Sequence, residues 1–163
     1  MENMRPAYAG FWKRFLASFI DSLIVSVAMS VVSIPVNILL GIRSTEMLNE
    51  EFRQLENNQE MMDFLSVLFL GVFVLFILGT IVNWLYFAFM ESSKSQATLG
   101  KMALGLKVTD LNGKRISFGK ATARSFSKLL SMAIFMIGYI MAAFTEKKQA
   151  LHDMIAGTLV IER

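Results

Sequence analysis

An arginine and an aspartate stand at the start of a long apolar segment. Arg14 and Asp21 are seven positions apart, with Ser18 between them. In a helix these positions share one face, and a rise of ~1.5 Å per residue places Asp21 roughly 10 Å farther along the axis than Arg14. A carboxylate at that depth in lipid costs at least ~2.5–3.5 kcal/mol on insertion scales. It therefore requires a partner, a water-filled cavity or a bound cation.

The composition is that of a membrane protein. The chain has 163 residues, of which 55% are hydrophobic, including 14 Phe and 12 Met. The net charge is +3, and the charges are divided between loops in a way that suits membrane topology better than nucleic-acid binding. We therefore expect the lipid bilayer as the surroundings of the chain and no nucleic acid as a partner.

The sequence gives no support to cofactor or metal chemistry. It contains no cysteine and a single His, which argues against disulfides, thiolate metal sites and structural zinc. Gly100-Lys101 is similar to part of a phosphate-binding loop, but the glycine five residues earlier is missing and Met102 replaces the Ser or Thr. No nucleophile–base pair is present, and the adjacency of His152 and Asp153 does not make one. We expect no cofactor, no metal site and no enzymatic activity.

The apolar pattern predicts an all-α membrane protein with two long transmembrane helices. The first covers about residues 12–40 and the second covers residues 63–90. Phe64–Met90 contains no charged residue and is long enough to cross ~30 Å of hydrocarbon. An acidic loop, residues 43–62, connects the two helices.

The basic loop that follows, residues 91–119, contains the pattern of a small β-hairpin. Leu106–Asp110 and Lys114–Phe118 flank the tripeptide Leu111-Asn112-Gly113. An Asn-Gly turn between two such segments is a strong short-range signal for a hairpin.

A third, shorter hydrophobic helix is expected over residues 120–145. Its charge-free part, Leu129–Phe144, spans only ~24 Å, and basic residues flank it on both sides. These features favour a re-entrant or interfacial helix, while the alternative is a third full span with the C-terminus outside. The tail, residues 146–163, ends in a short apolar strand suited to pair with Leu106–Thr109, which would hold the C-terminus in the cytoplasm.

The charges of the loops predict how the chain is oriented in the cell membrane. The N-terminus and the loop 91–119 are basic, whereas residues 43–62 are acidic. By the positive-inside rule the basic segments lie in the cytoplasm and the acidic loop lies outside. We expect a multi-pass protein of the plasma membrane that forms one domain.

These residues together resemble the RDD family of small prokaryotic membrane proteins, which is named for one arginine and two aspartates. Arg14 stands where the family has its arginine, and Asp21 stands where the first transmembrane helix has its aspartate. The second aspartate matches Asp153 in a Leu-His-Asp-(x)3-Gly-Thr element near the C-terminus. Further matching segments are Thr98–Lys101, Gly105–Asp110 and Ala123-Arg124.

The resemblance implies a membrane domain over the whole chain and a role connected with transport, because some members are associated with sodium/proton antiport. On that hypothesis Asp21 exchanges a monovalent cation for a proton, and Arg14 tunes this exchange or neutralises the empty site. Asp153 then serves as a second carboxylate or gate, and His152 relays protons.

A structural interpretation accounts for the same residues. Arg14, Asp21 and Asp153 would form a buried ion cluster in a non-transporting scaffold or accessory protein. Under either hypothesis, neighbouring polar residues support the three charged ones. Two or three spans are too few to enclose a transport pathway alone. We therefore expect a homo-oligomer or a partner membrane protein. The supporting residues are Ser18, Asn83, Tyr86, Arg124 and His152.

Overall fold

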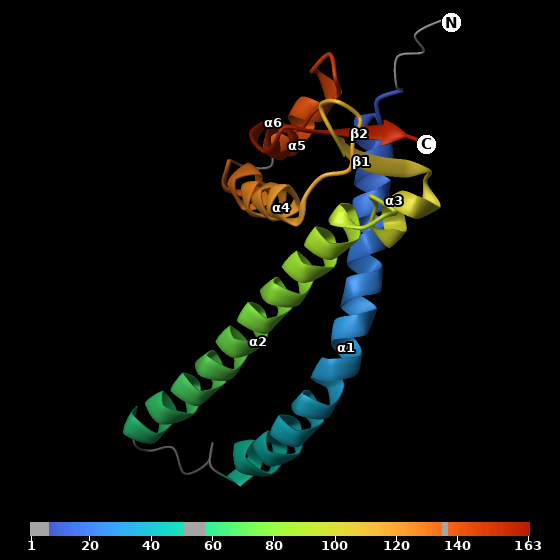
Figure 1. Cartoon of the computed structure of the whole chain (residues 1–163). Coiled ribbons are helices and arrows are strands. Elements are labelled where there is room, and N and C mark those ends of the chain that lie inside the picture. The colour runs from blue at the N-terminus through green and yellow to red at the C-terminus, as the bar shows by residue number, and fades with distance from the viewer. Residues whose placement is uncertain (1–6, 51–57, 135–136) are drawn as a thin grey trace, which may run out of the picture. The chain divides into compact units, whose positions relative to one another are not determined.

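Helices make up most of the structure, a computed structural model that describes residues 7–50, 58–134 and 137–163. This confirms the predicted membrane protein of long helices with a small sheet (Figure 1). In chain order the elements are α1 (Phe11–Glu50), α2 (Asn58–Ser92), α3 (Leu99–Ala103), β1 (Leu106–Asp110), α4 (Phe118–Ala133), α5 (Ile137–Ile140), the 3-10 helix η1 (Met141–Ala143), α6 (Leu151–Ala156) and β2 (Thr158–Glu162).

The chain divides into two compact units. The terminal unit comprises Met1–Leu23 and Asn83–Arg163, and the middle unit comprises Ile24–Val82. The middle unit consists of the second part of α1 and the first part of α2. All the shorter elements belong to the terminal unit, together with the start of α1 and the end of α2.

Among the residues that the structure describes, two helices are long and apolar enough to cross a membrane, which confirms the two predicted spans. Their apolar stretches are Phe11–Val31 in α1 and Phe69–Ser92 in α2. Both helices extend beyond the predicted ends, because α1 continues to Glu50 and α2 already begins at Asn58. A proline inside a helix, here Pro35, bends or weakens it without having to end it. The rest of the predicted acidic loop includes residues 51–57, which lie outside the described residues.

The predicted third hydrophobic helix is present but sharply bent. α4 starts at the N-cap Ser117, whose hydroxyl accepts a hydrogen bond from the backbone N–H of Lys120. α4 ends at Ala133 and α5 begins at Ile137, and the two helical parts are bent by 116° relative to each other. The single helix expected over residues 120–145 is therefore two shorter pieces.

The sheet has two antiparallel strands, and its second strand is the C-terminal one. β1 pairs with β2 with Val108 opposite Val160, as expected for the apolar tail. The predicted hairpin with residues 114–118 is wrong, because these residues form no strand. The Asp110 side chain explains the difference, since its Oδ1 accepts a hydrogen bond from the backbone N–H of Lys114 and closes a tight turn. The chain then leaves the sheet and enters α4.

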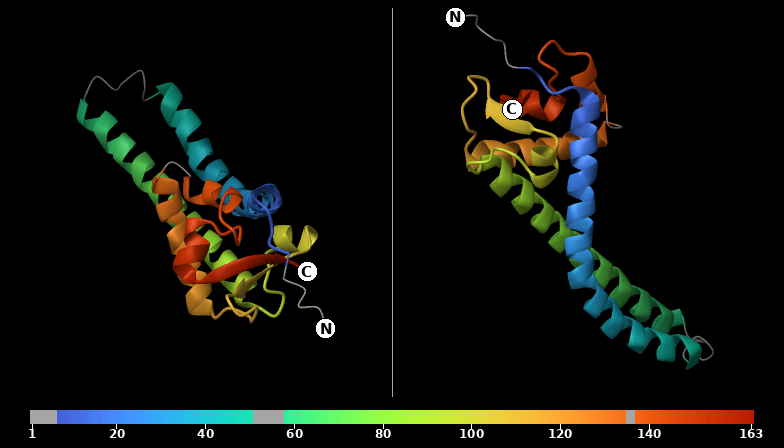
Figure 2. Two further views of the ribbon diagram at one scale, coloured as in Figure 1. Left: turned by 90° about the horizontal axis from the view of Figure 1, so that it is seen from above. Right: turned by 90° about the vertical axis from the view of Figure 1, so that its right-hand side faces the viewer.

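The residues before α1 and the segment after α2 join the sheet on its two edges. The Ala9 N–H donates to the Val160 carbonyl at 3.0 Å, and the Val108 N–H donates to the Gln96 carbonyl at 2.7 Å. Figure 2 shows the strands beside the start of α1. The buried apolar core of this layer consists of Ala9, Ala17, Ala88, Leu106, Val108, Ile116, Ala121 and Val160.

The variant Gly138→Ala tests how closely α5 packs on α4. A Cβ atom at Gly138 would lie 2.7 Å from the Oγ and 3.0 Å from the Cα of Ser131, so one helix must move. We expect the free energy of unfolding in detergent to fall by ~1–3 kcal/mol, measured by denaturant titration followed by circular dichroism. Gly71→Ala is the control, because a Cβ there meets no atom within 4 Å. Equal losses in both variants would contradict the close contact.

Candidate functional site

A chain of buried ion pairs runs through the terminal unit, and Asp153 stands at its centre. This fully buried residue in α6 accepts hydrogen bonds from Arg14 in α1 and from Arg124 in α4. The Nε and Nη2 atoms of Arg124 each lie 2.7 Å from Asp153 Oδ1. The backbone N–H of Ala150 donates to the other carboxylate oxygen at 3.1 Å, so Asp153 also caps the start of its own helix.

The ion pairs continue to a second carboxylate near the end of α2. Arg124 Nη1 donates to Glu91 Oε2 at 2.6 Å, and Lys101 Nζ donates to Glu91 Oε1 at 2.7 Å. Glu91 has no exposed surface, and Arg124 is 2% exposed. The Asp153 cluster, as we call it, joins α1, α2, α3, α4 and α6 through Arg14, Glu91, Lys101, Arg124 and Asp153.

Mutual pairing compensates the buried charges of the Asp153 cluster. Removing a charged group from water costs several kcal/mol, and the loss of one partner leaves the other charge uncompensated. The alternation of cation and carboxylate therefore makes each member depend on the next. A further cation, Lys128, lies beside the cluster with its Nζ 3.7 Å from the centroid of the Phe87 ring, whose face attracts a cation.

The two titratable residues of α6 respond differently to this environment. Burial alone would raise the pKa of Asp153, but the guanidinium groups of Arg124 and Arg14 outweigh it and hold that pKa well below the usual value. Burial, reinforced by the charge of Arg124, lowers the pKa of His152 to about 3. His152 is therefore neutral at pH 7, and its Nε2 lies 3.6 Å from Asp153 Oδ1.

Asp21 lies in a separate hydrogen-bonded site and not in the Asp153 cluster. Its Oδ1 accepts from the Tyr86 hydroxyl at 2.9 Å and from the Gly100 backbone N–H at 2.8 Å. Its Oδ2 accepts from the Thr98 hydroxyl at 2.5 Å. Asp21 is fully buried, and no cationic side chain of the described chain lies within 4.0 Å of its carboxylate. We call Asp21, Tyr86, Thr98 and Gly100 the Asp21 site.

A glycine is required where α3 meets α1. A Cβ atom at Gly100 would overlap the carbonyl oxygen of Ala17 and lie 3.0 Å from the backbone nitrogen of Asp21. Only glycine lets the backbone N–H approach the carboxylate this closely. The next residue, Lys101, reaches Glu91, so the short segment Thr98–Lys101 binds a carboxylate of each site.

The structure places the sequence-predicted residues in different surroundings. Arg14, Asp153 and Arg124 are in contact, and His152 packs next to them with its ring 5.0 Å from that of Tyr139. Tyr86 donates to Asp21. Ser18 and Asn83 are exposed.

Sequence reasoning missed four members of the two sites, namely Glu91, Thr98, Gly100 and Lys101. Glu91 carried a signal, because it is the first charge after the 27 uncharged residues from Phe64 to Met90. Thr98, Gly100 and Lys101 entered the sequence analysis as a segment that matches the family, and Gly100-Lys101 also as an incomplete phosphate-binding loop, but not as site residues. The spacing of Gly100 and Lys101 gave no indication that each would contact a different carboxylate.

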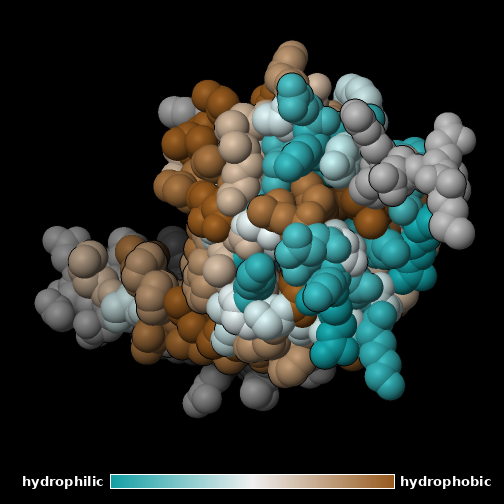
Figure 3. Space-filling view, turned by 45° about the horizontal axis from the view of Figure 1, so that its top comes forward, coloured by the Kyte–Doolittle hydropathy of each residue, from teal (hydrophilic) through white to brown (hydrophobic). Residues whose placement is uncertain are grey.

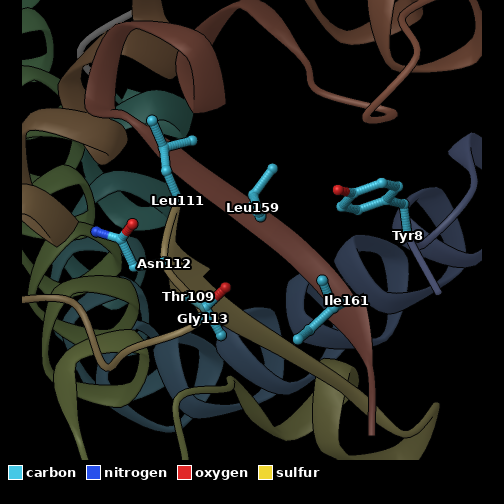
Figure 4. Close-up of a pocket in the computed structure, with 7 residues that line it drawn as sticks. All are labelled: Tyr8, Thr109, Leu111, Asn112, Gly113, Leu159 and Ile161. Atoms are coloured by element: carbon cyan, nitrogen blue, oxygen red, sulfur yellow. The ribbon is translucent and has the colours of Figure 1, made fainter. Parts of the chain in front are cut away.

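The terminal unit also has a pocket on the sheet that contains none of the predicted site residues. Its volume is about 340 Å³, and Figure 4 shows the seven residues around it. Tyr8 is its sole titratable residue. Within residues 7–50, 58–134 and 137–163 no group of three or more His, Asp or Glu side chains is placed to hold a metal ion. The pocket residues are Tyr8, Thr109, Leu111, Asn112, Gly113, Leu159 and Ile161.

Comparisons with known proteins agree with this membrane architecture. The family model described as "RDD family" matches residues 8–157. The chain is 40% identical to the uncharacterized protein YxaI of Bacillus subtilis, over 94% of this chain and 96% of YxaI. It is 30% identical to the uncharacterized membrane protein YteJ of the same organism, over 98% of this chain and 84% of YteJ. No solved structure matches the chain.

Asp153→Asn tests the energetic weight of the Asp153 cluster. The variant leaves Arg14 and Arg124 without their shared counter-charge, and we expect the free energy of unfolding in detergent to fall by ~3–5 kcal/mol. Glu162→Gln is the matched control, because its ion pair with Lys13 is solvent-exposed and should be worth at most ~1 kcal/mol. If the free energy of unfolding fell by the same amount in both variants, the buried ion pairs of the cluster would contribute no more to stability than an exposed one.

His152 predicts how stability depends on pH. Burial lowers the pKa of its imidazole from an ordinary 6.5 to about 3 in the folded protein. Between these two pH values His152 is therefore protonated in the unfolded chain but neutral in the folded protein. Stability should therefore decrease as the pH falls from about 6.5 toward 3. We expect the melting temperature of the wild type to drop more between pH 6.5 and 4.5 than that of His152→Gln. Parallel pH profiles of the two proteins would contradict the buried neutral imidazole.

Proposed function

The chain belongs to the RDD family, and we propose that it acts as a non-transporting accessory protein in which the Asp153 cluster and the Asp21 site have structural roles. The observation that carries the proposal is that protein donors already hold all three buried carboxylates. Asp153 and Glu91 each contact two cationic side chains, and Asp21 accepts from three donors.

Displacing these protein donors would cost free energy in a site that has to bind and release ions. A cation that displaces the protein donors of a buried carboxylate leaves each donor without its partner, at a cost of ~1–3 kcal/mol per donor. At Asp21 those donors are the start of α3, the Tyr86 hydroxyl and the Thr98 hydroxyl. Binding an ion there would detach α3 from α1, which favours a structural role.

The proposed orientation places both termini and the segment after α2 in the cytoplasm. Residues 7–9, β1 and β2 are joined by hydrogen bonds, so they must lie on one side of the membrane. Exposed cations on the terminal unit favour the cytoplasmic side under the positive-inside rule. These exposed residues include Lys13, Lys94, Lys114, Arg115, Lys120, Lys147 and Lys148.

An accessory role needs a partner, and the two spans leave room for one. Only 11% of the apolar window in α1 and 6% of that in α2 is buried by the chain itself. The remaining surface suits lipid and, in our proposal, a second copy of the chain or another membrane protein. Such a partner would pack against the helices while the terminal unit remains intact.

Cation–proton exchange through Asp21 is the competing function, and one observation favours it. Asp21 belongs to an apolar span and has no cationic side chain within 4.0 Å in the described chain, so its charge is compensated by neutral donors alone. A monovalent cation or a proton would complete that compensation.

A flux measurement in liposomes separates the two functions. Purified protein is reconstituted with a trapped pH dye, and Na⁺, Li⁺ or K⁺ is added outside at several pH values. We expect no cation-dependent proton movement from folded wild type, whereas a reconstituted sodium/proton antiporter in the same assay serves as the positive control. Proton movement that is present in the wild type and absent in folded Asp21→Asn would overturn the accessory role.

A further inference from the structure

The helix α4 has an inverted amphipathic pattern. Its polar residues Arg124 and Ser131 are buried, whereas Phe126, Leu129 and Leu130 are each more than half exposed. In a water-soluble domain the opposite arrangement is expected, because the apolar side of a surface helix packs on the core. The exposed side of α4 therefore suits an apolar medium.

The apolar surface continues beyond α4. Ile137 and Ile140 lie in α5, and Phe144, which directly follows η1, is 84% exposed. Figure 3 shows hydrophobic surface gathered on the left of the view, the side on which α4 and α5 lie in Figure 1, with hydrophilic surface on the opposite side. The exposed apolar residues form a continuous patch and are not scattered singly, and a patch of this kind indicates an interaction site.

Aromatic contacts connect this surface to the membrane-spanning part of α2. The ring of Trp84 lies 5.9 Å from that of Phe126 and 6.3 Å from that of Phe118. The ring of Phe89 lies 5.0 Å from that of Phe118 and is itself exposed. Trp84 and Phe89 belong to the apolar window Phe69–Ser92, so the lipid-facing surface of the span passes directly onto α4.

The sheet rules out α4, α5 and η1 as a third crossing. β1 precedes these helices and β2 follows them, yet the two strands are hydrogen-bonded to each other. A single crossing between them would place the strands on opposite sides of the membrane. Both Figure 1 and Figure 2 show α4 lying crosswise to the first turns of α1, as a helix parallel to the membrane plane does.

We propose that α4, α5 and η1 form an in-plane platform whose apolar surface is covered by phospholipid acyl chains. The platform lies in the leaflet where α1 begins and α2 ends, at the boundary between headgroups and hydrocarbon, ~5–10 Å deep. Its polar side faces the Asp153 cluster, so Arg124 is shielded from lipid by the terminal unit. The occupant is lipid, because the surface continues that of a membrane span and exposed Lys147 and Lys148 follow it at headgroup height.

Single cysteines test the path of the chain, since the natural sequence contains none. Lys114→Cys and Glu146→Cys flank the platform at exposed positions. In sealed, right-side-out or inverted vesicles, we expect a membrane-impermeant maleimide to label both positions from the same side. Labelling from opposite sides would establish a third span and overturn the platform.

Spin labels test what covers the apolar surface. Leu129→Cys and Ile140→Cys are labelled with a nitroxide in liposomes, and Arg115→Cys at an exposed loop position is the control. We expect high collision rates with oxygen and low rates with a water-soluble nickel chelate at the first two positions, and the reverse at Arg115. High nickel accessibility at Leu129 and Ile140 would show that water covers the surface. Low accessibility to both reagents would show a protein partner, and either result would overturn the proposal.

The labelled variants must be shown to fold before their accessibility is interpreted. Circular dichroism and size-exclusion chromatography identify folded variants, and neither Leu129 nor Ile140 belongs to the buried apolar core of the described residues. If one variant does not fold, Phe144→Cys replaces it, because Phe144 is the most exposed residue of the surface.

Discussion

The pairing of one buried carboxylate with two arginines is the interaction on which the terminal unit depends. Asp153 pairs with Arg14 from the start of α1 and with Arg124 from α4. Arg124 also donates a hydrogen bond to Glu91 at the end of α2. Buried charges tolerate little displacement, because desolvation makes each unpaired member costly. The cluster therefore determines how the short C-terminal elements dock against the ends of the two long helices.

The Asp21 site provides a second, electrically different anchor. Its carboxylate is held by two hydroxyl groups and one backbone N–H, and the close approach of Gly100 to α1 makes this possible. Thr98, Gly100 and Lys101 thus attach one short turn to α1 through Asp21 and to α2 through Glu91. The two anchors together attach the five-residue helix α3 to both longer helices.

Particular residues show what the sequence can and cannot reveal. The two spans follow from long apolar runs, and the two strands follow from apolar segments bounded by turn residues, because these signals are local. The strand pairing was predicted only in part. The apolar tail was correctly matched to Leu106–Thr109, and Val160 lies opposite Val108, whereas the Asn112-Gly113 signal favoured a local hairpin that does not form.

The candidate site shows the same limit. Residue type and expected depth identified Arg14 and Asp21 as charges that need partners, and the family resemblance added Asp153. They did not assign the partners, because pairing depends on which helices lie side by side. Glu91 pairs with Arg124 and Lys101, whereas Asp21 accepts hydrogen bonds from neutral donors. These contacts join residues that are 10 to 79 positions apart in the sequence.

A double-mutant cycle between Arg14 and Asp153 tests the structural role of the cluster most directly. The free energies of unfolding of wild type, Arg14→Gln, Asp153→Asn and the double variant are measured in the same detergent. The double variant should lose at least ~1 kcal/mol less than the sum of the two single losses, because each single substitution leaves a buried charge without its partner. Losses that add to within ~0.5 kcal/mol would show that the two residues act independently and would contradict the account.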